Sequence, residues 1–253
     1  LFLVLASLTL GLAACSSNPH KAEKIETEIE KKEQISGDTS LGIKDGNMVV
    51  QRKVQMNEEL RTLRRILDEN RLTPAAVLLT HGHIDHIWSA QKVADSYGCP
   101  AFIHPEDRHM LSDPIRGFGP RLGQLALGAL FREPKQVVDL DHDGAVLDFG
   151  GVAVTVDHTP GHTRGSVVFR VDAGGQQSSD SGTGPVVFTG DTLFKQSVGR
   201  TDLPGGSGNA LLNSIVGKLL VLDDDTLVLP GHGESSTIGA ERRTNPFLEG
   251  LTL

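Results

Sequence analysis

A chain of 253 residues is long enough to bury one sizeable hydrophobic core, and its 29 glycines are typical of a globular protein with many tight loops. The formal net charge of −8 argues against a nucleic-acid partner, because binding to phosphates needs a basic surface. The two cysteines, Cys15 and Cys99, exclude a disulfide framework, and Cys99 is expected to be a small buried thiol.

The chain opens with an apolar run, LFLVLASLTLGLAAC, that ends in small residues just before Cys15. This pattern is typical of a secretory signal segment, and the run is shorter than the roughly 20 residues that a membrane-spanning helix needs. The stretch LAAC, residues 12–15, resembles the lipobox of bacterial lipoproteins, in which the cysteine is lipidated. Residues 1–15 are therefore predicted to be a lipoprotein-like signal segment, with lipidation at Cys15 and a lipid-anchored location in the cell envelope. A chance apolar leader on a cytoplasmic protein is the alternative.

Residues 16–44 are dense in charge and almost without an apolar face, so they are predicted to form a charged tether rather than part of a core. A single folded domain is predicted to extend over residues 45–253. Asp45-Gly46 lies between apolar flanks and allows a hairpin there. The next segment places Leu60, Leu63 and Leu67 on one face, which predicts a helix capped by Asn57.

Strand-like and helix-like segments alternate along the rest of the chain, which indicates a single mixed α/β domain. Apolar β-type runs predict strands at residues 75–79, 101–104, 166–171, 185–190 and 226–231, and a pair of strands about Gly150-Gly151 within residues 145–158. Helical periodicity predicts helices at residues 89–98, which Gly98 ends, and at residues 209–222.

Four of these strands run into a Thr, Pro or Gly turn that is followed at once by side chains able to bind a metal. The candidates are His81, His83, Asp85 and His86 after the first strand, then His162, Asp191 and His232. Loops at the ends of rigid strands are where functional sites are usually built. His81 and His83 lie on the same side of an extended backbone, so both can reach one cation. Imidazole and carboxylate groups without a thiolate suit zinc, iron or manganese, and they make a purely structural zinc site less expected.

The same segments, in the same order, resemble the motifs of the metallo-β-lactamase-fold hydrolases: THGHIDH (80–86), TPGHT (159–163), TGD (189–191) and PGHG (230–233). Within that superfamily, GRTDLPGGS (199–207) and PGHGESSTIGAERRTNPFL (230–248) resemble the short glyoxalase II-like, or hydroxyacylglutathione hydrolase-like, group. The resemblance extends over residues 57–253. It implies an α/β fold, the αββα metallo-β-lactamase sandwich, with a dinuclear metal site between its two sheets.

The resemblance also implies a set of ligands. The first ion would be held by His81, His83 and His162, the second by Asp85, His86 and His232, and Asp191 would bridge the two. Two divalent ions are therefore expected, zinc by preference, with iron and manganese as alternatives. Residues 16–56 carry none of the strand motifs with which members usually begin, so the sandwich is expected to lack some N-terminal strands.

The expected activity is hydrolysis by a metal-bridging hydroxide, which two cations make available near neutral pH by lowering the pKa of bound water. Asp85 is predicted to be catalytic, because it can orient this hydroxide and take its proton. A thiolate leaves without an acid, whereas an amine needs one and the sequence offers no candidate. A small-molecule thioester, such as an S-acyl or hydroxyacyl thiol of the glyoxalase II type, is therefore the expected substrate; the thiol itself stays open.

Two other functions are compatible with these motifs. Persulfide dioxygenases resemble the same pattern, with a single iron held by the equivalents of His81, His162 and Asp191, and a chain that has lost its early strands could be an inactive remnant. The histidines outside the motifs are expected to be structural: His104, His109, His142 and His158. Arg200 and Asp202 are expected to brace their loop.

Overall fold

The computed structural model describes residues 2–5, 60–114, 131–149, 151–171 and 184–251. Cys15, the predicted tether 16–44, the hairpin at Asp45-Gly46 and the helix cap Asn57 lie outside these ranges, as do residues 16–56, to which the expected loss of strands refers. The lipid anchor and the envelope location therefore stay predictions. Within the described ranges, no helix is both long enough and apolar enough to cross a bilayer.

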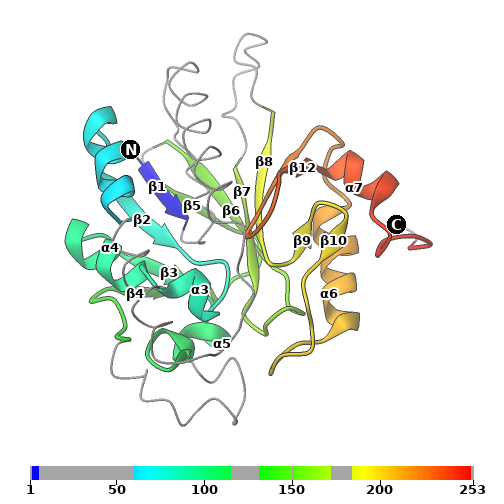
Figure 1. Cartoon of the computed structure of the whole chain (residues 1–253), viewed down its shortest axis with the longest axis horizontal. Coiled ribbons are helices and arrows are strands. Elements are labelled where there is room, and N and C mark those ends of the chain that lie inside the picture. The colour runs from blue at the N-terminus through cyan, green and yellow to red at the C-terminus, as the bar shows by residue number, and fades with distance from the viewer. Residues whose placement is uncertain (1, 6–59, 115–130, 150, 172–183, 252–253) are drawn as a thin grey trace, which may run out of the picture.

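The first sheet has four parallel strands in the order β1-β2-β3-β4 (Figure 1). Their bounds are β1 Phe2–Leu5, β2 Pro74–Leu78, β3 Ala101–Ile103 and β4 Val137–Asp139. The predicted strands at 75–79 and 101–104 are confirmed as β2 and β3. The apolar start of the chain supplies the edge strand β1, and β4 was not predicted.

Helices cover the outer face of this sheet. Residues 60–70 are helical, as predicted, and so is α4, Ala90–Tyr97, which Gly98 ends in the left-handed conformation at φ 65°. Leu63 and Leu67 pack with the outward side chains of β2, Val77 among them. Three short helical turns complete this half: α3 Ile84–Ile87, α5 Pro105–Arg108 and a 3-10 turn His109–Leu111.

The second sheet has six strands in the order β12-β11-β8-β7-β6-β5, all antiparallel except for the parallel pair β8 and β11. The bounds are β5 Ala145–Asp148, β6 Ala153–His158, β7 Val167–Val171, β8 Val186–Gly190, β11 Leu227–Pro230 and β12 Ser236–Thr237. The strand pair predicted within residues 145–158 is confirmed as β5 and β6. A small hairpin, β9 Leu193–Phe194 and β10 Ser197–Val198, follows β8.

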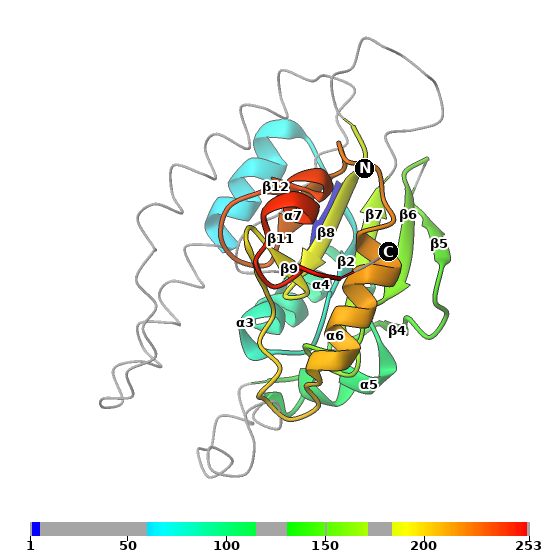
Figure 2. The ribbon, with the colours of Figure 1, turned by 90° about the vertical axis from the view of Figure 1, so that its right-hand side faces the viewer.

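The outer face of the second sheet is covered by α6, Gly208–Ser214, and α7, Ile238–Thr244 (Figure 2). The side chain of Ser207 caps α6, and that of Thr237 caps α7. The helix predicted at 209–222 is in place, but its second half, Ile215–Leu219, has π-helical hydrogen bonding. Helix α7 was not predicted.

The core between the two sheets forms because the side chains of each inner strand alternate between two apolar layers. Leu78 and Phe102 point from the first sheet toward Val154 and Phe169 of the second, and all four side chains are buried. The layers are therefore helix, sheet, sheet, helix, and the predicted αββα sandwich is confirmed. Cys99 is buried and free, as expected.

Candidate metal centre

The strand ends bring the seven candidate side chains together. His81 and His83 follow β2 and precede α3, which carries Asp85 and His86. His162 follows β6, Asp191 follows β8, and His232 follows β11. Three overlapping groups each have one ligand atom per residue within 4.8 Å of the others: His81, His83, His162; His81, His86, Asp191; and Asp85, His86, His232.

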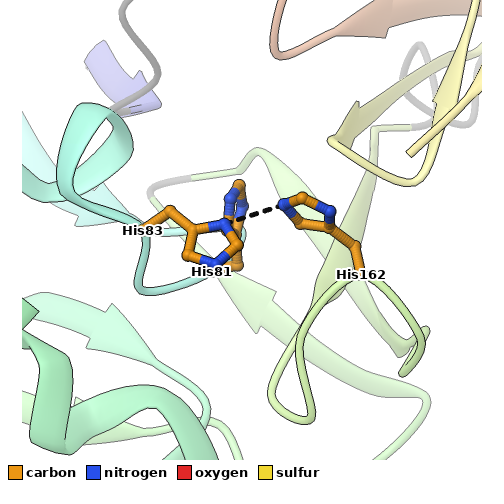
Figure 3. Close-up of side chains that lie close together, drawn as sticks. All are labelled: His81, His83 and His162. Carbon is orange, nitrogen blue, oxygen red and sulfur yellow. Dashed lines mark hydrogen bonds between the residues drawn. The ribbon is translucent and has the colours of Figure 1, made fainter. Parts of the chain in front are cut away.

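The first group consists of three buried histidines, which Figure 3 shows converging from two loops. His83 Nδ1 lies 2.8 Å from His162 Nε2. On its other side, His162 Nδ1 donates a hydrogen bond to the carbonyl of Arg200 at 2.8 Å. Only one nitrogen of a neutral imidazole carries a proton. Nε2 of His162 therefore has a free lone pair, which faces the other two histidines.

The other two groups share His86 and bring carboxylates to the histidines. His86 Nε2 lies 3.1 Å from His232 Nε2, which in turn lies 3.1 Å from Asp85 Oδ2. Asp191 faces histidines of both ends of the site: Oδ1 is 3.3 Å from His86 Nε2, and Oδ2 is 3.6 Å from His162 Nε2 and 3.7 Å from His232 Nε2. Asp191 is therefore the side chain placed to reach two ions at once.

The electrostatics favour the protonation state that binds cations. Burial and neighbouring rings lower the pKa of His81 far below its usual value, that of His83 to about 4, and that of His162 as well. Burial opposes ionisation of the two carboxyl groups, but the surrounding histidines hold the pKa of Asp85 and of Asp191 below the ordinary range. Near neutral pH these groups are neutral imidazoles and charged carboxylates, which are metal ligands.

The pKa of His86 is shifted the other way. Burial alone would lower it, but the charge of Asp191 and a hydrogen bond to the same carboxylate raise it. The two carboxylates thus favour the protonated form of His86, and a bound cation would replace that proton as their counter-charge.

The residues present fit a pair of transition-metal ions. Two buried ring nitrogens, His81 Nε2 and His86 Nδ1, have no hydrogen-bond partner among the described residues, although buried polar atoms are nearly always paired. Two pairs of ring nitrogens also face each other, and a proton can serve only one nitrogen of each pair. Nitrogen and oxygen donors of this kind suit zinc, iron or manganese.

Glycines before two of the candidate ligands allow close approach of the backbone. Gly161 has φ 145°, and a side chain there would overlap the backbone of Leu211 in α6. A side chain at Gly231 would overlap Asp191 and lie 2.8 Å from Cε1 of His86. The loop that carries His162 is thus pressed onto α6, and the loop that carries His232 is pressed onto the site itself.

Gly161→Ala is expected to destabilise the fold by about 1–3 kcal/mol, because the added methyl overpacks the contact with α6 and the residue keeps a strained φ. The matched control is Gly217→Ala, at a helical glycine where a methyl meets open space. This control is expected to be neutral or stabilising. Urea unfolding of both variants measures the difference, and equal midpoints would contradict the close packing of the His162 loop.

Two of the histidines outside the motifs, His104 and His158, make structural contacts, as expected. The rings of His104 and His158 stack at 4.1 Å; His104 caps α5, and His158 Nε2 donates to the carbonyl of Arg164. The guanidinium of Arg200 pairs with Asp202 at 2.7 Å on the surface, which braces the loop whose backbone carbonyl holds His162.

The sequence did not reveal one buried side chain that contacts the site loops, Asp107. Its carboxylate is 1% exposed and accepts hydrogen bonds from the two loops that carry the first group of histidines. In the sequence it stands in PEDR, an acidic start of a short helix, which is also the pattern of a solvated helix end.

Histidine and aspartate side chains that could hold metal ions thus gather at the strand ends of an αββα sandwich, the arrangement of a metal-dependent enzyme. Residues 54–232 match the metallo-beta-lactamase superfamily, and the chain belongs to this family. It is 71% identical over 191 residues to an uncharacterized protein of Mycobacterium tuberculosis, covering 76% of this chain and 83% of the relative. It is 34% identical over 191 residues to hydroxyacylglutathione hydrolase GloC of Haemophilus influenzae, with the same coverage of 76% and 83%.

Solved structures show the same fold. The crystal structure of BLEG-1, a B3 metallo-beta-lactamase, superposes with a TM-score of 0.61 at 38% identity, covering 75% of this chain and 84% of that one. The crystal structure of TTHA1623 in a di-iron-bound form gives a TM-score of 0.55 at 35% identity, covering 74% and 83%. A similar structure therefore holds two metal ions.

Proposed function

We propose that the protein is a dinuclear metal-dependent hydrolase of thioesters, such as S-acyl or S-hydroxyacyl thiols. The observation that carries this proposal is the meeting of two histidine-rich groups at Asp191, whose two oxygens face different histidines. The similarity to hydroxyacylglutathione hydrolase GloC supports the substrate class.

The proposed ligands follow the three groups of side chains. His81, His83 and His162 would hold the first ion; Asp85, His86 and His232 would hold the second; and Asp191 would bridge the two. The similar di-iron structure supports a pair of ions. Zinc is the proposed metal, with iron and manganese as alternatives, because all three accept nitrogen and oxygen donors.

When bound, two divalent cations would lower the pKa of a water held between them and polarise a substrate carbonyl. Asp85 would orient that water and take its proton. Its side chain is 33% exposed, and Oδ2 lies 3.1 Å from His232 Nε2, a proposed ligand of the second ion. A thiolate departs without a proton, so thioester hydrolysis needs only this base and the polarised carbonyl.

The test measures metal and activity on the same purified protein. Elemental analysis is expected to find two ions per chain, and thiol release is expected from S-lactoylglutathione or simpler acyl thioesters, but not from a lactam. Asp85→Asn keeps a ligating oxygen and cannot accept a proton, so kcat is expected to fall by about 100-fold with the metal retained. A single iron with oxygen uptake on a thiol persulfide would show a dioxygenase instead, and a protein with neither metal nor activity would be an inactive remnant.

A further inference from the structure

A single buried carboxylate, that of Asp107, accepts three hydrogen bonds from the loops of the metal centre. Oδ2 accepts from the backbone N–H of Gly82 at 2.9 Å and from the hydroxyl of Thr163 at 2.6 Å. Oδ1 accepts from the backbone N–H of Gly165 at 2.9 Å. Asp107 lies in α5 and is 1% exposed, so these bonds are made away from competing water.

The three donors come from the two loops that carry the first group of histidines. Gly82 is the residue between His81 and His83, and Thr163 follows His162 directly. One backbone hydrogen bond joins the two segments nearby, from the N–H of Val167 to the carbonyl of Thr80 at 2.8 Å, but the three donors themselves lie outside the strands. Asp107 thus holds both loops at one point and, through them, keeps the three histidine rings close together.

The Thr163 contact is itself fixed by a second hydroxyl. Ser166 Oγ accepts the backbone N–H of Thr163 at 3.1 Å and lies 2.7 Å from Thr163 Oγ1. Because the Thr163 hydroxyl donates to the carboxylate, the Ser166 hydroxyl donates to Thr163 in turn. Both hydroxyls have a single consistent orientation, which holds the residue after His162 in one rotamer.

The packing leaves the two loops little freedom around the carboxylate. A side chain at Gly82 would come within 2.9 Å of the Asp107 carbonyl and 2.7 Å of Cε of Met110. A side chain at Gly165 would come within 2.7 Å of Cγ of Asp107. Both backbones therefore rest directly against α5, so a shift of Asp107 would be transmitted to the histidines.

We propose that Asp107 is a positioning residue of the metal centre, which sets the spacing and aim of His81, His83 and His162 without touching an ion or substrate. The inference rests on the metal centre of the proposed function and is independent of the thioester substrate. A buried carboxylate is costly to place in a protein interior, and three donors from the ligand loops compensate that cost here.

The test is Asp107→Asn, which keeps the shape of the side chain. Whichever way the amide is turned, its NH₂ group faces the N–H of Gly82 or that of Gly165, so at least one of these buried backbone donors loses its acceptor. Competition with a chromophoric chelator is expected to show metal binding weakened by about 10–100-fold, the range that loss of a ligand-orienting partner usually costs. The absorption spectrum of the cobalt-substituted protein is expected to change, and kcat is expected to fall more than KM rises.

Glu241→Gln is the matched control. Glu241 is also 1% exposed, and it accepts from Gln196 N–H and Asn245 Nδ2, both at 2.8 Å, and from the Ser236 hydroxyl. It joins α7 to the β9–β10 hairpin, and among the described residues none of its hydrogen bonds reaches the loops of the first group. This variant is expected to melt at a lower temperature, as Asp107→Asn does, but to retain the metal affinity and the cobalt spectrum of the unmodified protein.

An Asp107→Asn protein that melts early yet binds metal as tightly as the unmodified protein would overturn the proposal, since a purely structural residue behaves like the control. If Asp107→Asn does not fold, Thr163→Val takes its place, because it removes one donor and leaves the other two. A smaller weakening of metal binding is then expected, and unchanged binding would overturn the proposal. A protein that binds metal but hydrolyses no thioester would refute the substrate class alone.

Discussion

Replacing Asp191 by alanine is expected to remove most of the bound metal, whereas Asp85→Ala is expected to spare the first ion. Asp191 lies within 3.7 Å of ring nitrogens of His86, His162 and His232, so its loss withdraws a carboxylate from the proposed ligands of both ions. Asp85 approaches only His86 and His232, which are proposed ligands of the second ion. Metal affinity in Asp191→Ala is expected to fall by more than about 100-fold, the upper end of what losing even an indirect partner costs.

Elemental analysis after equilibrium dialysis against a weak chelator measures this difference. Asp191→Asn is an informative intermediate, because it keeps one oxygen ligand and removes the charge. The exposed Glu249→Gln serves as the control for the loss of a carboxylate outside the centre, and it is expected to keep two ions. Equal metal content in the Asp191→Ala and Asp85→Ala proteins would show that Asp191 does not bridge.

Removal of metal with a chelator is expected to lower the melting temperature by roughly 10 °C. A ligand present at a thousand times its dissociation constant stabilises the native state by about 4 kcal/mol, and each kcal/mol corresponds to about 2–4 °C in a domain of this size. Without a cation, His81 Nε2 and His86 Nδ1 are buried and lack hydrogen-bond partners among the described residues. Calorimetry with and without chelator measures the shift in melting temperature, and addition of zinc checks its reversal. An unchanged melting temperature after chelation would contradict a contribution of metal to stability.

The metal-free protein is also expected to lose stability as the pH falls. Burial and the His162 ring lower the pKa of His83 from 6.5 to about 4, and the pKa values of His81 and His162 are lowered too. Between these pH values the unfolded chain binds more protons than the folded one, so the free energy of unfolding decreases from pH 6.5 toward pH 4. His86, whose pKa is raised, contributes stability that is fully present below pH 6.5 and leaves this slope unchanged.

The candidate side chains could be singled out in the sequence, because each follows a strand whose apolar residues are recognisable, and the structure brings them together. In the sequence, His162 and His232 each directly follow a turn at the end of a strand. The pairing of the strands in the second sheet then brings these strand ends together. Apolar β-type runs likewise predicted β2 and β6, whereas the αββα sandwich was expected from the resemblance to the metallo-β-lactamase-fold hydrolases. The strands, and the position of the candidate side chains at their ends, follow from such short-range patterns.

Asp107 could not be predicted in this way, because its partners at Gly82 and Thr163 lie 25 and 56 residues away and Gly82 offers a backbone N–H group. Every residue except proline has a backbone N–H group, so the residue type does not reveal which of these groups donates to a buried side chain. The π-helical second half of the predicted 209–222 helix is similar, because its hydrogen-bond pattern is not encoded in apolar periodicity. The short strand β4 is largely exposed and has too few residues for a period to be recognised.

The contact between Gly231 and Gly190 has a consequence for how the protein can evolve. The N–H of Gly231 donates to the carbonyl of Gly190 at 2.7 Å, so the backbone joins the two strands one residue before both Asp191 and His232. A side chain at Gly231 would overlap Asp191, and the neighbouring β9–β10 hairpin is joined to β8, because the Thr189 hydroxyl donates to the carbonyl of Leu193 at 2.7 Å. Substitutions at Gly190 or Gly231 would therefore disturb Asp191 and His232 together, so these two strand ends can change only jointly in evolution.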